Sequence, residues 1–381
     1  MQLFDEPKTP RTAWLGSSEP AVRWYSEATR DEAVASRGAV NTWYASFPDS
    51  DGIFAARLRS ENDIDHRQAL DELFIHQLLR KTHPDIRYEE GGVGPDFRVY
   101  ETGSCVAAVE VASLFMRTDW ASRASQHDRL ADEVNRRVRP TAGYFLDFDI
   151  ESAPNDPAPR HFAQFVKREL ESLPPHELLA DISPEDVPAC VYERNGVRIR
   201  LRFLPMKPDA KSKLDPEARI VGIGPMTVGM VNSGSRISDV VGKKGGERYE
   251  LGSYPYLVAV GVHDPMASDD VIFDGLYGGE AVQFTRDDPD NYTVVRRNDG
   301  LFGADRERTT GRHRRISGVV TFRYFPGGPN PPQVTLYENP FAHHAAPEVL
   351  IGETRRFGRA HDEDGGDFIW RDGSPPGAQA P

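Results

Sequence analysis

The spacing of apolar residues predicts a helix in the first quarter of the chain. Within residues 64–79, leucine and phenylalanine side chains recur at intervals of three and four residues, so they line one face of a helix. Asp63 or Asp65 is the expected cap at its start. The helix should end before Pro84, because the residue that precedes a proline avoids the helical conformation.

Strand-like runs follow this helix. Two of them, 96–100 and 105–114, are separated by only four residues, as in a hairpin. Further apolar patterns predict a strand at 86–90, a helix at 119–139, a strand at 143–150 and a helix at 161–173. We therefore expect residues 61–180 to form one α/β domain with a mixed central sheet.

The apolar runs after this domain predict a second, α+β region at 188–345. The run 256–262 is almost continuously apolar, which is typical of a strand that is buried on both faces. Other strands are expected at 189–192, 197–204, 220–231, 319–324 and 334–337, with a short helix at 236–241. Residues 1–60 have the character of an irregular N-terminal extension, and residues 346–381 are expected to form a mostly disordered tail.

Composition restricts the class of protein. The chain has 381 residues, of which 38% are hydrophobic and 10% aromatic, and this composition supports folded domains. No apolar run reaches the ~20 residues that a membrane span needs, and the N-terminus has no secretory signal. Cys105 and Cys190 are the only cysteines, so we expect no disulfide framework and no cysteine metal cluster. The sequence therefore predicts a cytoplasmic protein that does not enter a membrane.

The net charge of −13 at pH 7 argues against a protein that coats nucleic acid over its whole surface. A local patch remains compatible with it. Residues 296–315 hold seven arginines, and the candidates for phosphate contacts are Arg306, Arg308, Arg312, Arg314 and Arg315. The alternative is a solvated loop. Lys243 and Lys244, in the segment 242–246, are further candidates for binding an anion, against the alternative of a helix end with a glycine stop.

Three acidic residues stand where the predicted elements can bring them together. Asp96 opens the first hairpin strand, and Glu110 lies inside the apolar partner strand. A carboxylate in the middle of such a strand is costly to bury unless it is paired or binds a metal. Glu72 lies on the preceding helix. Each has an ordinary alternative: a turn residue for Asp96, an ion pair with an arginine for Glu110, and a solvated helix acid for Glu72.

This order of a helical acid, Pro95-Asp96 and Glu110-Val111 resembles the PD-(D/E)XK nuclease superfamily, which has the restriction-endonuclease-like fold, over residues 61–150. The resemblance implies a metal-dependent nuclease that hydrolyses phosphodiester bonds of DNA or RNA, with bacterial genome defence as a natural setting. Asp96 and Glu110 would be the central Mg²⁺ ligands, with Mn²⁺ as a substitute ion, and Glu72 would bind the ion directly or through water. A homodimer or a partner protein of a defence system is compatible with this reading.

The chain departs from the family pattern at one position, because Ala112 stands where the motif lysine is expected. The chain has only eight lysines, so few can replace it. Lys81 lies about 13 Å along the helix from Glu72, which is too far. Lys243 and Lys244 can approach only if the second region docks on the first, and Gln126 on the helix 119–139 is the preferred catalytic helper. The departure leaves open a catalytically weakened nuclease fold that binds nucleic acid or a protein partner.

Overall fold

The computed structural model divides the chain into two compact units, which we describe separately. The larger unit comprises Met1–Pro7, Arg30–Met116 and Met230–Pro381, and the smaller unit comprises Lys8–Thr29 and Arg117–Gly229. The structure describes residues 2–381 except 91, 93, 117, 140–142, 180–181, 184–185, 208–218, 222–232, 246–248, 250, 286–287, 305–310, 348–349, 351–354, 360–367 and 371–381. At 118–121, 233, 284–285, 288–291, 359 and 368–370 it describes the backbone only.

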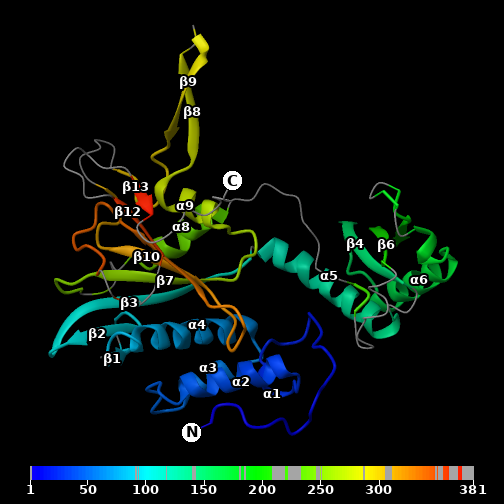
Figure 1. The fold of residues 1–381 in the computed structure, drawn as a ribbon, viewed down its shortest axis with the longest axis horizontal. Helices are drawn as coiled ribbons and strands as arrows, with labels where there is room; N and C mark the ends of the chain where they lie inside the picture. Colours follow the sequence, from blue (N-terminus) through cyan, green and yellow to red (C-terminus); the bar gives the residue numbers. More distant parts are fainter. Residues whose placement is uncertain are drawn as a thin grey trace. The chain divides into compact units, whose positions relative to one another are not determined.

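An eight-stranded mixed sheet forms the centre of the larger unit, so the predicted α/β class with a mixed sheet is confirmed (Figure 1). Its strands are, in spatial order, β1 (Asp85–Tyr88), β2 (Phe97–Glu101), β3 (Ser104–Leu114), β7 (Tyr256–Val262), β10 (Gly318–Arg323), β11 (Gln333–Glu338), β12 (Arg355–Arg359) and β13 (Phe368–Trp370). The first three strands are antiparallel, and β3, β7 and β10 run parallel to one another.

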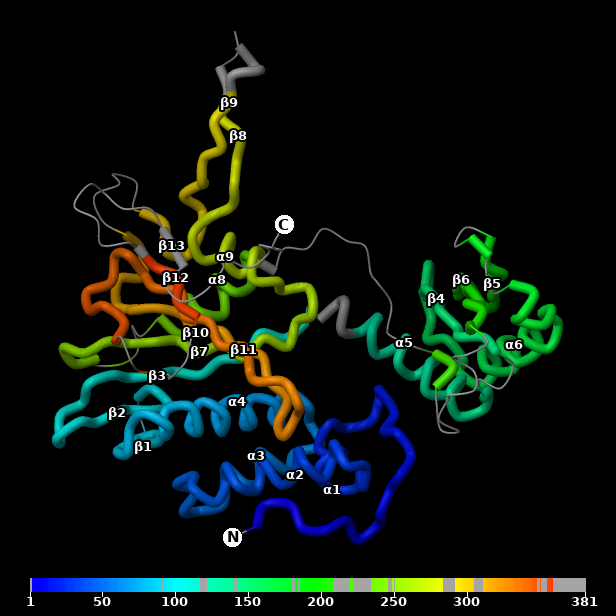
Figure 2. Tube along the Cα trace, viewed as in Figure 1, coloured from blue at the N-terminus to red at the C-terminus, as the bar shows by residue number. Residues whose placement is uncertain are grey.

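The pairing of β3 with β7 joins two parts of the chain that the sequence placed in different domains. Figure 2 shows these strands side by side, and the register aligns Glu110 with Val258 and Ala112 with Val260. All seven residues of β7 are buried, as their continuous apolar run predicted. Because such strands need a neighbour on each side, the early hairpin and the late strands share one sheet.

Helices cover both faces of this sheet. They are α2 (Asp31–Tyr44), α3 (Ile53–Leu58), α4 (Asp63–Arg80), α8 (Ser233–Lys243) and α9 (Asp269–Tyr277). Figure 1 shows α4 against one face, with α2 and α3 beyond it, and α8 and α9 on the other face. The expected cap of α4 was wrong by one residue, because the side chain of Asn62 accepts a hydrogen bond from the Ile64 N–H.

On the α8 and α9 face, small residues of β3 let the helices approach the sheet closely. Ala108 and Ala112 belong to a buried cluster with Ile237 and Val241 of α8 and with Leu276 of α9. On the same unit, β8 (Glu280–Thr285) and β9 (Asp288–Arg296) form a separate two-stranded hairpin. The alanine at the position of the motif lysine therefore packs in a helix–sheet core.

The smaller unit has a core of its own around the three-stranded antiparallel sheet β4-β6-β5. Its elements are α1 (Arg23–Ser26), α5 (Thr118–Arg137), β4 (Tyr144–Ser152), α6 (Pro159–Ser172), the 3₁₀ turn His176–Leu179, β5 (Ala189–Arg194) and β6 (Val197–Pro205). Leu130 and Val134 of α5 and Phe162 of α6 pack with Phe148 of β4. The apolar stripes of these helices therefore cover one face of the small sheet.

The units differ from the division at 61–180 and 188–345 that the sequence suggested. The strand predicted at 143–150 pairs with β6 in the smaller unit, so it takes no part in the sheet of the hairpin. Residues 1–60 are helical over α2 and α3, and the tail contains β12 and β13. Most of the strand predicted at 220–231 lies outside the described residues. Among the described residues, no helix is long and apolar enough to cross a membrane.

Candidate active site

Asp96 and Glu110 lie next to each other across the β2–β3 hairpin. The register pairs Phe97 with Val109, so Asp96, one residue before β2, stands opposite Glu110. The Oδ2 atom of Asp96 accepts a hydrogen bond of 2.6 Å from the Val111 N–H. The hairpin, with a shift of register between Val99 and Tyr100, therefore places both predicted metal ligands at one point of the sheet.

The electrostatic environment of Asp96 marks this point as a site. Burial, together with the neighbouring carboxylates Glu72 and Glu110, raises the pKa of the Asp96 carboxyl to about 8, against the opposing effects of the Val111 N–H hydrogen bond and of Lys244. Like charges that share a site disfavour the ionised form of the central group. A bound cation would relieve this repulsion, and such strongly perturbed groups concentrate at functional sites.

Glu110 is buried, with 1% of its surface exposed, and it has a basic partner. Lys244 Nζ lies 2.6 Å from Glu110 Oε1. The Tyr249 hydroxyl lies 3.1 Å from each carboxylate oxygen of Glu110 and donates to them. The alternative of an ion pair is thus confirmed with a lysine in place of an arginine, so the burial of this carboxylate is compensated.

The β3–β7 pairing explains how Lys244 reaches the strand. Lys244 follows α8, which packs on the Ala112 face of β3, and the Tyr256 hydroxyl of β7 donates to the Lys244 carbonyl at 2.6 Å. Arg315 donates to the Tyr249 carbonyl at 3.2 Å. Both backbone contacts hold the cation and the hydroxyl in place beside Glu110.

Glu72 contributes charge to the site, but its oxygens already have partners. Arg57 donates to both of them, at 3.0 and 2.5 Å, and the Tyr88 hydroxyl donates to Oε2 at 2.8 Å. Burial and the Glu72 charge raise the pKa of the Tyr88 hydroxyl. The structure therefore places Glu72 near Asp96 as a fixed, paired carboxylate, and its predicted role as a metal ligand stays a prediction.

The donor set fits a magnesium ion. Among the described residues, no group of three or more His, Cys, Asp or Glu side chains is arranged for holding a metal. Mg²⁺, however, is commonly bound by one or two carboxylates together with waters and substrate phosphates. Asp96 and Glu110 supply two adjacent carboxylates, and the pKa of Asp96 is raised first by burial and then by the charges of Glu72 and Glu110. These two residues could hold the ion.

The other predicted site residues have varied positions. Gln126 lies in α5 of the smaller unit, so its role as a catalytic helper stays a prediction. Lys243 is exposed at the end of α8. Arg312 donates to the carbonyls of Asn298 and Gly300, and Arg314 donates to the Phe341 carbonyl, so both support loops. Arg306 and Arg308 lie outside the described residues.

Sequence reasoning assigned no role to Arg57, Tyr88 or Tyr249. These side chains reach the site from α3, from β1 and from the segment after α8. The sequence around each of these residues has no feature that distinguishes it from other arginines and tyrosines near the ends of helices and strands. Lys244 was among the few lysines considered as substitutes for the motif residue, and only the strand order shows that it is the one that reaches Glu110.

A second buried polar cluster lies next to Glu72 on α4. Asp71 is fully buried, and its oxygens accept from Ser113 Oγ at 2.5 Å, from the Tyr324 hydroxyl at 3.2 Å and from His263 Nε2 at 2.8 Å. Gly261 is required there, because a Cβ atom at this position would lie 2.1 Å from Asp71 Oδ2. The cluster ties α4 to β3, β7 and β10.

Replacing Asp71 by alanine is expected to lower the free energy of unfolding by about 3 kcal/mol, because three half-buried polar groups lose their common buried acceptor. Urea denaturation followed by circular dichroism measures the change. Asp65→Ala, an exposed acid in the first turn of the same helix, should stay within about 0.5 kcal/mol of the wild type. Equal stability of both variants would show that the cluster does not hold α4 to the sheet.

Comparisons of the chain with protein-family models, with curated proteins and with solved structures find no match.

Proposed function

We propose that the larger unit is a metal-dependent nuclease with a restriction-endonuclease-like core, which hydrolyses phosphodiester bonds of nucleic acid, with DNA as the expected substrate. The observation that carries the proposal is the 2.6 Å contact between Lys244 Nζ and Glu110 Oε1, beside Asp96. The family motif consists of two acids and a lysine. Ala112 stands at the position of that lysine on β3, and Lys244 would supply the lysine from another part of the chain. The proposal rests on this site and on the resemblance of the motif, since fold alone does not define function.

The arrangement of elements supports the proposal independently of Lys244. A helix with a buried acid, α4, lies on the sheet beside the antiparallel hairpin β2–β3. Asp96 directly precedes β2, and Glu110 lies in β3. The strand β3 then continues the sheet in parallel with β7. A mixed sheet that carries these acids is compatible with the core that the resemblance implies.

The residues of the site have distinct roles in the proposed reaction. Asp96 and Glu110 would hold the metal ion, which when bound supplies Lewis-acid stabilisation and an activated water. The Lys244 side chain is 30% exposed, so its ammonium group can face the substrate phosphate while it contacts Glu110. The Tyr249 hydroxyl orients the Glu110 carboxylate. Glu72, held by its partners, keeps the environment of Asp96 negative.

Cleavage of plasmid DNA, single-stranded DNA and RNA with Mg²⁺, Mn²⁺ or EDTA tests the proposal. Asp96→Asn and Glu110→Gln, which keep shape but remove charge, should each lower metal-dependent cleavage by at least about 100-fold. Asp85→Asn is the matched control, because Asp85 is an exposed aspartate on β1 of the same sheet. It should cleave like the wild type.

The proposal would be wrong if the folded wild type cut none of these substrates with either ion. Titration calorimetry with Mn²⁺ then distinguishes a site that binds metal without hydrolysis from a site that binds no metal. Mn²⁺ binding that is lost in Asp96→Asn would indicate a metal-binding module without hydrolytic activity. Absence of Mn²⁺ binding would remove the metal site as well.

A further inference from the structure

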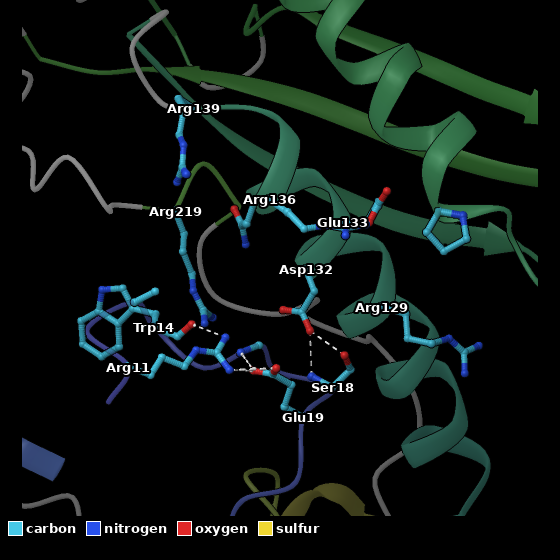
Figure 3. Close-up of a pocket in the computed structure, with 14 residues that line it drawn as sticks. Arg11, Trp14, Ser18, Glu19, Arg129, Asp132, Glu133, Arg136, Arg139 and Arg219 are labelled. Carbon is cyan, nitrogen blue, oxygen red and sulfur yellow. Dashed lines mark hydrogen bonds and ion pairs between the residues drawn. The ribbon is translucent and has the colours of Figure 1, made fainter. Parts of the chain in front are cut away.

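The smaller unit contains a pocket that is separate from the acids of the proposed active site. Its volume is about 450 Å³, within the range of ~300–1,000 Å³ that small-molecule sites occupy. Side chains of α5, of the N-terminal segment 11–19 and of Arg219 line it (Figure 3). All of these residues belong to the same unit.

The wall of this pocket is held in a defined position. The Asp132 carboxylate of α5 accepts hydrogen bonds from the N–H groups of Ser17 and Ser18, at 2.8 and 2.9 Å, and from Ser18 Oγ at 2.6 Å. A Cβ atom at Gly16 would lie 2.6 Å from Asp132 Oδ2, so a bare backbone allows this approach. Arg219 donates to a carbonyl of the same segment. The N-terminal segment is thereby fastened to α5.

The pocket has an excess of positive charge, although the chain as a whole has a charge of −13. Five arginines and three carboxylates line it. The carboxylates are all engaged: Glu19 pairs with Arg11 at 2.8 Å, Glu133 pairs with two arginines of α5, and Asp132 accepts the N–H groups described above.

Two of the lining arginines remain uncompensated by an acid. In the part of the chain that the structure describes, no carboxylate forms an ion pair with Arg139 or Arg219. Figure 3 labels both side chains, together with Trp14, among the residues that line the pocket. Two guanidinium groups that lack a carboxylate, in a concave site, are suited to binding a phosphate.

Trp14 supplies the second element of recognition, since it lines the pocket and 40% of its surface is exposed. An exposed indole beside cations stacks on a planar ring, and base–aromatic stacking is a principal contact of proteins that bind single strands. We propose that this pocket binds a nucleotide, with its base against Trp14 and its phosphate on Arg139 and Arg219. The assignment does not depend on the nuclease proposal, because binding needs no metal and no cleavage.

A nucleotide can come from a single strand or from a free mononucleotide. Fluorescence anisotropy of labelled 12-residue DNA and RNA strands, measured with EDTA on the full chain, tests the first source. Competition with AMP tests the second, and inorganic phosphate shows whether the base contributes. Binding of the strand without competition by AMP assigns the strand, and full displacement by AMP assigns the free nucleotide.

Trp14→Ala is expected to weaken binding about tenfold, and Trp14→Phe should restore most of it because stacking is retained. Arg139→Gln should also weaken binding and lower the salt dependence of strand binding, with a slope smaller by about 0.7. Arg194→Gln is the matched control, since Arg194 is exposed in the same unit and does not line the pocket. It should change the dissociation constant less than about twofold.

The proposal fails if the wild type binds neither the strand nor AMP. It also fails if folded Trp14→Ala and Arg139→Gln bind like the wild type, or if Arg194→Gln weakens binding as much as they do. Displacement by inorganic phosphate as effective as that by AMP would assign an anion site without base recognition and overturn the role of Trp14. The two proposals can be separated, because Asp96→Asn should lower cleavage by at least about 100-fold, whereas competition by AMP should be weakened only by Trp14→Ala and Arg139→Gln.

Discussion

Replacing Lys244 by alanine is expected to lower the rate of metal-dependent cleavage about 10²–10³-fold, the usual loss when one charge-stabilising group is removed from an active site. Lys244 Nζ lies 2.6 Å from Glu110 Oε1, and β3 itself contains no lysine or arginine. The positive charge at the site therefore comes from another part of the chain. Single-turnover cleavage of plasmid DNA at saturating protein measures the rate without a contribution from binding.

Lys243 provides the sharpest control for this experiment. It is the preceding residue, has the same charge and is exposed. Lys243→Ala removes the same charge from the same helix end, so it can weaken strand binding but should change the saturated rate less than about threefold. If both variants lost the rate equally, Lys244 would act through general attraction of the substrate and have no specific role at Glu110.

Stability has to be separated from chemistry in the Lys244 variant. Removing the lysine leaves Glu110 buried without its cation, which is expected to lower the free energy of unfolding by about 3 kcal/mol. All variants should therefore be compared at a temperature well below the lowest melting temperature. Lys244→Arg retains a cation beside Glu110 and should cleave faster than Lys244→Ala at an equal folded fraction. Equal rates of the two variants would contradict a role for the charge.

The local part of the site could be predicted from the sequence. Asp96 and Glu110 are separated by a short hairpin, and the alternation along a strand follows from the spacing of its apolar residues. The register, however, shifts by one residue between Val99 and Tyr100, and without this irregularity Asp96 would stand opposite Val109. The sequence therefore indicated that the two acids lie close together, but not the pairing that sets them opposite each other. The helix α4 and the position of Glu72 on it follow in the same way from the apolar period.

The cation could not be predicted, because its place depends on strand order. Lys244 lies beside Glu110 only because β7 pairs with β3, which places α8 and Tyr249 next to the same strand. The intervening elements belong to the smaller unit, and nothing in their local pattern indicates that the chain returns to the same sheet. Pairing between distant strands is decided by burial of whole faces, which single-residue patterns do not reveal.

The helices α2 and α3 could not be predicted from the sequence for a related reason. Their sequences mix polar and apolar residues with little periodicity, so they suggested an irregular extension. In the structure Trp43 of α2 packs on Phe74 and Tyr324, and Arg57 of α3 pairs with Glu72. Tertiary contacts with α4 and the sheet outweigh the weak local preference of these segments.

Metal binding at the proposed active site is expected to release a proton and to depend steeply on pH. The pKa of Asp96 is raised to about 8 by burial and by the charges of Glu72 and Glu110, with Lys244 acting in the opposite direction. At pH 7 the fraction of metal-free protein in which Asp96 is protonated is therefore about 0.9, whereas an ordinary aspartate would be ionised. Because a metal ion binds the carboxylate, the apparent affinity for Mn²⁺ should rise about tenfold per pH unit from about pH 6 to about pH 8, and then level off.

Titration calorimetry with Mn²⁺, in two buffers that differ in ionisation enthalpy, measures the number of protons released at pH 7. The expected value is about 0.9 for the wild type and for Asp85→Asn, whereas Asp96→Asn, which lacks the proposed ligand, should give no binding heat. An affinity that does not change between about pH 6 and about pH 8 would show that Asp96 is already ionised in the free protein or does not bind the ion.

The stability of the metal-free protein should also depend on the protonation of Asp96. Metal affinity should rise with pH, whereas stability should fall. The pKa of Asp96 lies far above its ordinary value of 3.8, so the folded chain binds a proton that the unfolded chain has lost. The contribution of Asp96 to stability is therefore complete below about pH 4 and is lost as the pH rises through about 8. In EDTA, the melting temperature of Asp96→Asn should therefore fall less than that of the wild type as the pH rises over this range. Mg²⁺ should raise the melting temperature of the wild type most at the alkaline end. A parallel decline of both proteins would mean that another group controls the loss.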